Sequence, residues 1–302
     1  MNQALLASAL VLGAASPALA QPEPIVEATM DRGSRGHLII DVEVNGAGPF
    51  PFLVDTGAQG TVVFPALVEA LEIAAIEGRQ VMVQGASGLT QVSFYTLDSL
   101  EIGDIELADF DVVGGPQGAS EAFATYRTYG IIGANILNDY SVEFDFADQA
   151  MRLFNPETDF EQASDGWSRT PYTLNRAGFA VLDAEINGTD LAAVLDLGAS
   201  HNVINAAATD ALAFAPEELT ARTATIRGFS GNGEAPPLVD GNAMTTGDWQ
   251  VTDVELAVFD SPAFGALGLG ETPAMFLGFP LFEGRSLLFD RAQEELVISP
   301  RA

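Results

Sequence analysis

The sequence predicts an all-β protein made of two duplicated halves, with only a few short helices. Residues 52–58 read Phe-Leu-Val-Asp-Thr-Gly-Ala, and residues 193–199 read Ala-Val-Leu-Asp-Leu-Gly-Ala. Each stretch is an apolar run that ends in Asp-x-Gly-Ala, and nearly half of the chain separates Asp55 from Asp196. A repeat of this length indicates two copies of a domain-sized unit rather than a solenoid.

The duplication extends well beyond the two aspartate motifs. A strand pattern followed by Asn-Gly, the strongest short hairpin signal, comes before each motif. Two further apolar segments follow each motif at nearly constant spacing. The matched segments are 38–46 with 179–188, 131–133 with 276–278, and 142–145 with 287–290. Unrelated β proteins also reuse strand and turn residues, but four matches in the same order favour duplication.

The rest of the chain is typical of hairpins. Short runs rich in Val, Ile, Leu, Phe and Thr alternate with Gly, Asn, Asp and Pro, as β-strands and turns do. Strand-forming runs lie at 80–83, 91–95 and 101–107. Short helices are expected at Pro65–Leu71, Ala134–Leu137 and Ala206–Ala213.

The start of the chain is typical of a secretory signal peptide. An apolar run over residues 4–12 precedes Ala18-Leu19-Ala20, a small-x-small cleavage pattern, although no Arg or Lys comes first. We therefore expect a signal peptide over residues 1–20 and an exported protein, either periplasmic or secreted. The remaining segments are a lead-in at 21–36, an N-terminal lobe at 37–155, a connector at 156–172 and a C-terminal lobe at 173–302.

Composition excludes several classes of function. The formal net charge is −30, and all 12 basic residues are arginine. Such a surface disfavours nucleic acid and anionic membranes, whose phosphates need clustered cations. The chain has no cysteine, which removes disulfides, thiol nucleophiles and a lipoprotein anchor. It also has no lysine for a Schiff base. We expect no membrane anchor and no nucleic-acid partner.

The two histidines, His37 and His201, limit the alternatives further. A Ser-His-Asp triad could use Ser200, His201 and Asp196, but Ser200 is outside any Gly-x-Ser-x-Gly elbow. A histidine-rich zinc site is excluded by number. An ion bound only by carboxylates, such as calcium, stays open, but no Asp-x-Asp-x-Asp-Gly loop supports it. No glycine-rich motif opens a helix after a strand, as nucleotide binding would require. We expect neither a metal nor a cofactor.

Paired carboxylates are the chemistry that remains. Two aspartates held close together do not ionise independently, because like charges in a partly buried site repel. One carboxylate can then take a proton from a bound water while the other, still protonated, donates to a carbonyl oxygen. This arrangement hydrolyses an amide without a covalent intermediate.

The motif at 52–58 resembles the active-site motif of the aspartic protease clan, which includes pepsins and retropepsins. Residues 131–137 and 276–282 resemble the hydrophobic-hydrophobic-Gly element that packs beneath the active-site loop in that clan. Alanine after each glycine resembles retropepsins, whereas the single duplicated chain resembles pepsins. The best resemblance is to a bacterial periplasmic retropepsin-like protein with two fused repeats. It implies a bilobal pepsin-like double barrel, an aspartic endopeptidase activity, a peptide or protein substrate and a monomer.

The resemblance also assigns roles to the residues of the two motifs. It makes Asp55 and Asp196 the catalytic pair and gives the Thr56 hydroxyl the task of bracing the two loops against each other. Gly57 and Gly198 are expected to permit the tight turn that points each carboxylate inward. The loop-supporting residues implied are Thr56, Gly57, Ala58, Leu197, Gly198 and Ala199.

Two hairpins are candidates for a flap over the substrate. The first spans residues 81–88 and the second, its counterpart in the other half, spans 226–233. The residues at their tips that would contact substrate are Gln84, Gly85, Ala86, Gly228 and Phe229. The sequence does not say which of the two hairpins closes over substrate.

Leu197 departs from the family pattern, which has Thr or Ser after the second aspartate. Leucine has no hydroxyl, so half of the bracing network is missing. Either packing keeps the loop geometry, or the chain is a non-catalytic homologue that binds peptides at the same site.

Overall fold

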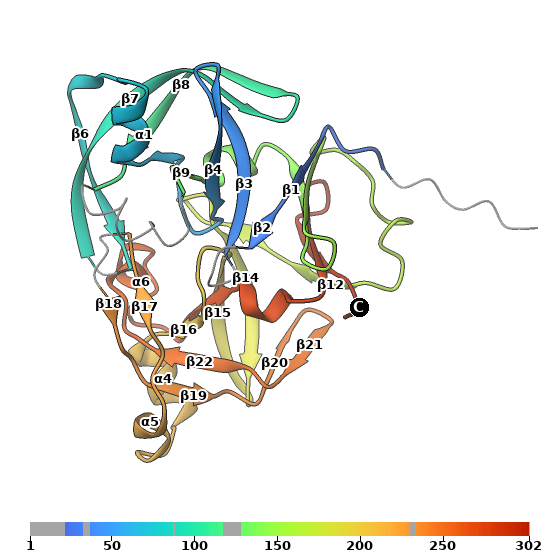
Figure 1. Ribbon diagram of the computed structural model, residues 1–302. Helices are drawn as coiled ribbons and strands as arrows, with labels where there is room; N and C mark the ends of the chain where they lie inside the picture. The colour runs from blue at the N-terminus through green and yellow to red at the C-terminus, as the bar shows by residue number, and fades with distance from the viewer. Residues whose placement is uncertain (1–21, 33–36, 87, 117–127, 230–232, 302) are drawn as a thin grey trace, which may run out of the picture.

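The computed structural model describes residues 22–32, 37–86, 88–116, 128–229 and 233–301. The predicted signal peptide lies outside the described residues, as do Gln21 and residues 33–36 of the lead-in. Figure 1 shows two lobes, one built from each half of the chain, joined on one side by a shared sheet.

The N-terminal lobe is an eight-stranded sheet in the order β2-β3-β4-β9-β5-β8-β7-β6. An additional pairing between β3 and β7 closes it into a barrel. Two short helices, α1 (Pro65–Ala70) and α3 (Ala134–Leu137), accompany the sheet. The strands are β2 (Asp31–Arg32), β3 (Leu38–Val44), β4 (Ala47–Val54), β5 (Val62–Val63), β6 (Ala75–Gly85), β7 (Gly88–Ile102), β8 (Ile105–Gly114) and β9 (Gly130–Ile132).

The C-terminal lobe repeats this plan as a nine-stranded sheet, ordered β19-β22-β16-β23-β15-β14-β20-β21 with β13 beside β14. Its strands are β13 (Thr173–Leu174), β14 (Ala180–Ile186), β15 (Thr189–Asp196), β16 (Asn202–Ile204), β19 (Leu238–Asp240), β20 (Ala243–Thr246), β21 (Trp249–Thr252), β22 (Glu255–Val258) and β23 (Ala274–Gly278). A separate ribbon pairs β17 (Ile226–Arg227) with β18 (Gly233–Glu234). The helices are α4 (Ala206–Leu212), α5 (Glu218–Ala221), α6 (Pro262–Ala266) and the 3₁₀ turn η1 (Phe279–Phe282).

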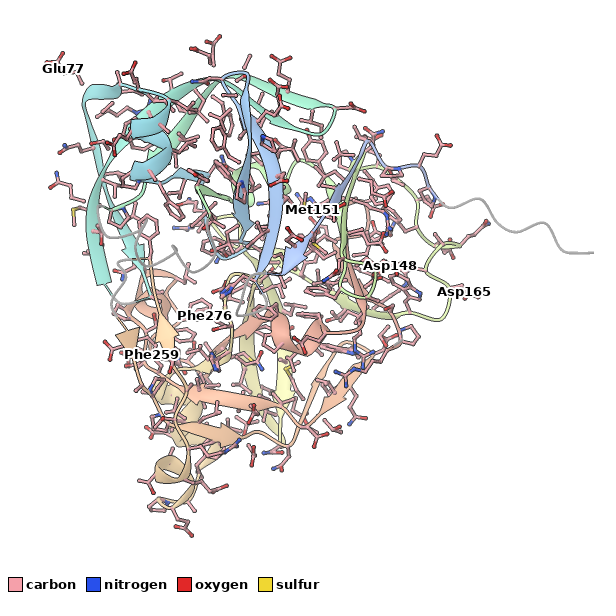
Figure 2. The ribbon with its side chains drawn as sticks, viewed as in Figure 1. Glu77, Asp148, Met151, Asp165, Phe259 and Phe276 are labelled. Carbon is pink, nitrogen blue, oxygen red and sulfur yellow. The ribbon has the colours of Figure 1, made fainter. Side chains whose placement is uncertain are left out.

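A six-stranded sheet joins the lobes. Its order is β1 (Val26–Thr29), β11 (Ala150–Phe154), β10 (Ser141–Asp145), β24 (Ser286–Asp290), β25 (Glu295–Ile298) and β12 (Ser168–Pro171). At its centre β10 pairs antiparallel with β24, so the repeated segment 142–145 lies against its own copy. The lead-in supplies one edge strand and the connector supplies the other. Met151, labelled in Figure 2, is a fully buried residue of this sheet.

Strand pairing confirms the predicted duplicated all-β architecture. In each lobe the strand before the aspartate runs parallel to the strand ending in the hydrophobic-hydrophobic-Gly element, β4 with β9 and β15 with β23. The strand after the aspartate loop pairs antiparallel with that same element in both lobes. Both Asn-Gly pairs form the predicted hairpin turns, with positive φ at Asn45, Gly46, Asn187 and Gly188.

The local predictions hold with one correction. The three predicted helices form within a residue of the expected ends, and α4 ends where Ala213 enters the left-handed region at φ 53°. The run 101–107 is not one strand. Gly103 has φ +56° and makes a turn between β7 and β8, because glycine tolerates that conformation at little cost. Apolar residues on both sides of the turn hide it from a reading of hydrophobic pattern.

One hydrophobic core extends through both lobes. Phe144 of β10 and Phe289 of β24 meet edge to face at 6.0 Å between ring centroids. Phe146 and Trp249 each stack on Phe282, at 6.3 and 5.4 Å. The Phe144–Phe289 and Phe146–Phe282 contacts join the two halves, so the core fixes how the two aspartate loops face each other. Among the described residues, no helix has the length and apolar character needed to span a membrane.

Candidate active site

The two aspartates lie at equivalent ends of buried central strands. Asp55 directly follows β4, and its amide donates a hydrogen bond of 3.0 Å to the carbonyl of Ile132 in β9. Asp196 is the last residue of β15, opposite Gly278 of β23. The apolar strand ends anchor each loop, because the three residues before each aspartate are buried on both faces of the sheet.

The carboxyl groups of the two aspartates contact each other across the lobe boundary. A Cβ atom on Gly57 would lie 2.5 Å from Cγ of Asp196, and one on Gly198 would collide with the carboxyl of Asp55. Each carboxyl therefore occupies the space that a side chain on the opposite glycine would need.

This geometry corrects the expected role of the glycines. Neither Gly57 nor Gly198 has a positive φ, so a left-handed turn is not what requires glycine there. The requirement is the close approach of the other lobe's carboxyl. Any larger residue at either position would push the two aspartates apart.

Backbone amides lie near both carboxyl groups. The Gly57 amide donates to Oδ1 of Asp55 at 2.7 Å. The nearby amides of Ala58 and Gly198 also lower the pKa of Asp55, and the Ala58 amide donates to the main-chain carbonyl of Asp55 at 3.3 Å. The amides of Gly198 and Ala199 likewise lower the pKa of Asp196, and the Ala199 amide donates to the main-chain carbonyl of Asp196 at 3.0 Å. The two carboxyl groups lie close enough for one to donate a hydrogen bond to the other when one of them carries a proton.

The environment raises the pKa of both aspartates. Burial raises the pKa of Asp55 above its ordinary value of 3.8, although the surrounding amides oppose that shift. Burial, followed by the nearby charge of Asp55, raises the pKa of Asp196 well above 3.8. The pair therefore holds one proton at pH values where an exposed aspartate has lost its own.

Thr56 links the two loops. Its hydroxyl donates to the carbonyl of Leu195 at 3.1 Å and accepts from the amide of Leu197 at 2.9 Å, and both bonds are buried. Leu197, at the equivalent place in the second copy, is fully buried in the main core. The brace between the loops is thus a hydrogen-bonded hydroxyl on one side and apolar packing on the other.

The hydrophobic-hydrophobic-Gly elements lie directly beneath the aspartate loops. A Cβ on Gly133 would lie 2.8 Å from the Ala58 carbonyl oxygen, and one on Gly278 would lie 2.7 Å from that of Ala199. The residues that follow donate to the same carbonyls, Ala134 at 2.8 Å and Phe279 at 3.2 Å. Both alanines of the Asp-x-Gly-Ala motifs are therefore held from below.

The two candidate flap hairpins both reach the opposite lobe. Gln84 turns back on its own hairpin, donating to the Gly85 carbonyl at 2.7 Å. The carbonyl of Ala86 accepts a hydrogen bond of 2.9 Å from the Ser261 hydroxyl in the C-terminal lobe. Gly228 is buried, and Phe229 packs on an apolar cluster of the N-terminal lobe.

Sequence reasoning missed Ser261. It caps α6, accepting from the Ala263 amide at 3.3 Å, while binding the hairpin tip of the other lobe. Ser-Pro at 261–262 is a readable helix-start signal, but the contact with Ala86 joins segments far apart in the chain.

The Ser200 hydroxyl lies 3.1 Å from Nδ1 of its neighbour His201. Across the described ranges, no three His, Asp or Glu side chains are placed to hold a metal ion.

Two lobes that each contribute one aspartate loop to a common centre define the aspartic protease fold. A family model for aspartyl proteases matches residues 40–136 and 182–281, well over half of the chain and both of its halves. The chain belongs to the aspartyl protease family, as a retropepsin-like protein with two repeats. No curated protein matches it.

Thr56→Val should lower the free energy of unfolding by about 2–6 kcal/mol. The change leaves the Leu195 carbonyl and the Leu197 amide buried without their partner, at roughly 1–3 kcal/mol for each group. Urea unfolding measures the loss. Thr56→Ser keeps the hydroxyl and should recover most of the stability; equal stability of the two variants would contradict this role.

Asp196→Asn should stabilise the protein at neutral pH more than at pH 3.5. The native pair binds its proton more tightly than the unfolded chain does, so the wild type loses stability as the pH rises above about 4. Asparagine carries no charge and removes that loss. Urea unfolding of both proteins at pH 3.5 and 7 measures the difference.

The matched control is Asp190→Asn, an exposed aspartate on the same strand. It should show little of this pH dependence. A wild type that exceeds Asp196→Asn in stability by as much at pH 7 as at pH 3.5 would rule out a shared proton.

Proposed function

We propose that this chain is an aspartic endopeptidase that hydrolyses peptide bonds with a water molecule activated between Asp55 and Asp196. The observation that carries the proposal is the contact between the two carboxyl groups across the lobe boundary. The family match supports the same class of chemistry.

The geometry supplies the two proton positions that the reaction needs. The ionised member of the pair takes a proton from the water, and the water oxygen attacks the peptide carbonyl carbon. The protonated member donates to the carbonyl oxygen, giving a neutral tetrahedral intermediate. The aspartate that took the proton from water then donates it to the leaving nitrogen, while the other aspartate takes a hydroxyl proton back from the intermediate; the C–N bond breaks, the amine and the acid leave, and the pair returns to its starting state. No bond to the protein forms at any stage.

The loops fix this pair before a substrate arrives. The Gly57 amide donates to the Asp55 carboxyl, the amides of Ala58, Gly198 and Ala199 lie near the two carboxyl groups and favour their charged forms, and the Thr56 hydroxyl holds the loops together. Preorganised donors of this kind need little rearrangement during the reaction. Peptides or proteins are the proposed substrates, and the signal-peptide pattern supports an exported enzyme that meets them outside the cytoplasm.

One observation favours a second candidate, a peptide-binding homologue without catalytic activity. Leu197 replaces the hydroxyl residue that would brace the second loop. Two facts oppose this reading: Leu197 is fully buried, and the Asp196 carboxyl still meets Asp55. Packing therefore supplies what the missing hydroxyl does not.

Cleavage of a diverse peptide pool, followed by mass spectrometry from pH 3 to 7, tests the proposal. Asp55→Asn and Asp196→Asn should each lower the rate by about a thousandfold or more, because general acid–base catalysis alone contributes about 10²–10⁴-fold. Activity should fall toward higher pH as the pair loses its shared proton.

Ser200→Ala and Asp190→Asn are the controls, and both should retain activity. Cleavage that survives in both Asp55→Asn and Asp196→Asn would exclude this pair of aspartates, the dyad, as the catalyst. Folded wild-type protein that cleaves nothing at any pH would instead favour the peptide-binding homologue.

A further inference from the structure

Each of the two hairpins makes contact with the lobe that it does not belong to. The hairpin of β6 and β7 reaches the C-terminal lobe at Ser261 through the Ala86 carbonyl. The ribbon of β17 and β18 reaches the N-terminal lobe through Phe229. Figure 1 shows these hairpins approaching each other at one side of the molecule, while Glu77 marks the far end of β6 in Figure 2.

The surface that Phe229 contacts is an apolar wall beside the dyad. We call it the N-terminal wall; it consists of Ile39, Leu53, Val62, Phe64 and Ile131. Residues next to Leu53 in β4, Phe52 and Val54, belong to the main core, so Leu53 faces the other side of the sheet. Since Leu53 lies two residues before Asp55, the wall begins next to the catalytic carboxyls.

Contacts with both lobes hold Phe229 in place. Three residues earlier, Ile226 packs on a cluster of the C-terminal lobe that includes Phe264 and Phe276; Figure 2 labels Phe276. On the other side, a Cβ on Gly85 would lie 3.1 Å from Cβ of Phe229. Phe229 therefore meets both the N-terminal wall and the opposing hairpin.

Ser261 holds the first hairpin against the C-terminal lobe. Its side chain is almost fully buried, and its hydroxyl donates to the Ala86 carbonyl at 2.9 Å. The tip of the first hairpin is thus bound to the start of α6 while its Gly85 lies against Phe229. To release Phe229 from the wall, the two hairpins must separate.

We propose that Phe229 is a self-blocking residue: it occupies the N-terminal wall, which a substrate side chain must use, so the free protein is closed to peptides. The inference rests on the proposed function. Adjacent residues of an extended peptide are about 3.3 Å apart, so a peptide bond at the dyad brings a neighbouring side chain to Leu53. Phe229 and an apolar substrate side chain compete for that place.

The sequence of the two hairpin tips points the same way. Both read Gly-x-Ser-Gly, with Ala86 at the variable position in the first copy and Phe229 in the second. Phe229→Ala makes the second tip identical to the first and removes the blocking ring. Phe229→Leu keeps an apolar side chain on the wall and is the matched control.

Association of a dye-labelled octapeptide with Phe-Phe at its centre, followed by stopped flow in the Asp196→Asn background, tests the proposal. The dyad variant binds without cleaving. Adding Phe229→Ala should raise the association rate about tenfold, as expected if the open state is populated at about one tenth. Adding Phe229→Leu should change it by less than about twofold. Ser261→Ala, which frees the Ala86 carbonyl, should also accelerate association.

The outcomes separate this proposal from the proposed function. Wild-type cleavage together with an unchanged rate in the Phe229→Ala chain overturns the blocking role alone. Faster association without any cleavage by the Phe229→Ala chain that keeps both aspartates supports blocking and overturns the endopeptidase. If association is not faster and no variant cleaves peptides, both the blocking role and the endopeptidase activity are overturned. Circular dichroism of every variant checks the fold, and agreement between Phe229→Ala and Ser261→Ala excludes an effect of one damaged hairpin.

Discussion

The contact between the Asp55 and Asp196 carboxyl groups is the constraint that the rest of the structure serves. Two like charges in a partly buried place repel, so the pair stays together only with a shared proton and surrounding amide donors. The glycines leave room for the contact, the Thr56 hydroxyl ties the loops, and the six-stranded sheet fixes the lobes. The same features that cost stability at neutral pH create the proton donor and acceptor that the proposed hydrolysis needs.

The two halves differ at positions where the fold does not require the same residue in both copies. Thr56 and Leu197 occupy equivalent positions, yet one bonds to the opposite loop and the other packs in the core. One hydroxyl suffices, because it both donates and accepts across the boundary. Ala86 and Phe229 are also equivalent, and only the second carries a side chain that reaches the opposite wall. Gene duplication in one chain permits such division of labour, whereas two identical subunits could not differ.

Much of the fold and the dyad could be predicted from the sequence, because the relevant signals are local. The Asn-Gly pairs, the apolar strands and the repeated Asp-x-Gly-Ala each depend on neighbours in the chain. The reason for Gly57 could not be predicted, since it depends on Asp196 from the other half. The turn at Gly103 was hidden by apolar residues on both sides. Ser261 and the wall under Phe229 depend on contacts between lobes, which no local pattern records.

Titration of the side-chain carboxyl carbons by NMR, with Asp55 and Asp196 assigned from their asparagine variants, measures directly whether the two aspartates share a proton. A shared proton predicts that one carboxyl of the pair stays protonated well above the ordinary aspartate value of 3.8. It also predicts that replacing one aspartate shifts the titration of the other. Two carboxyl groups that titrate independently near 3.8 would contradict a proton shared between Asp55 and Asp196.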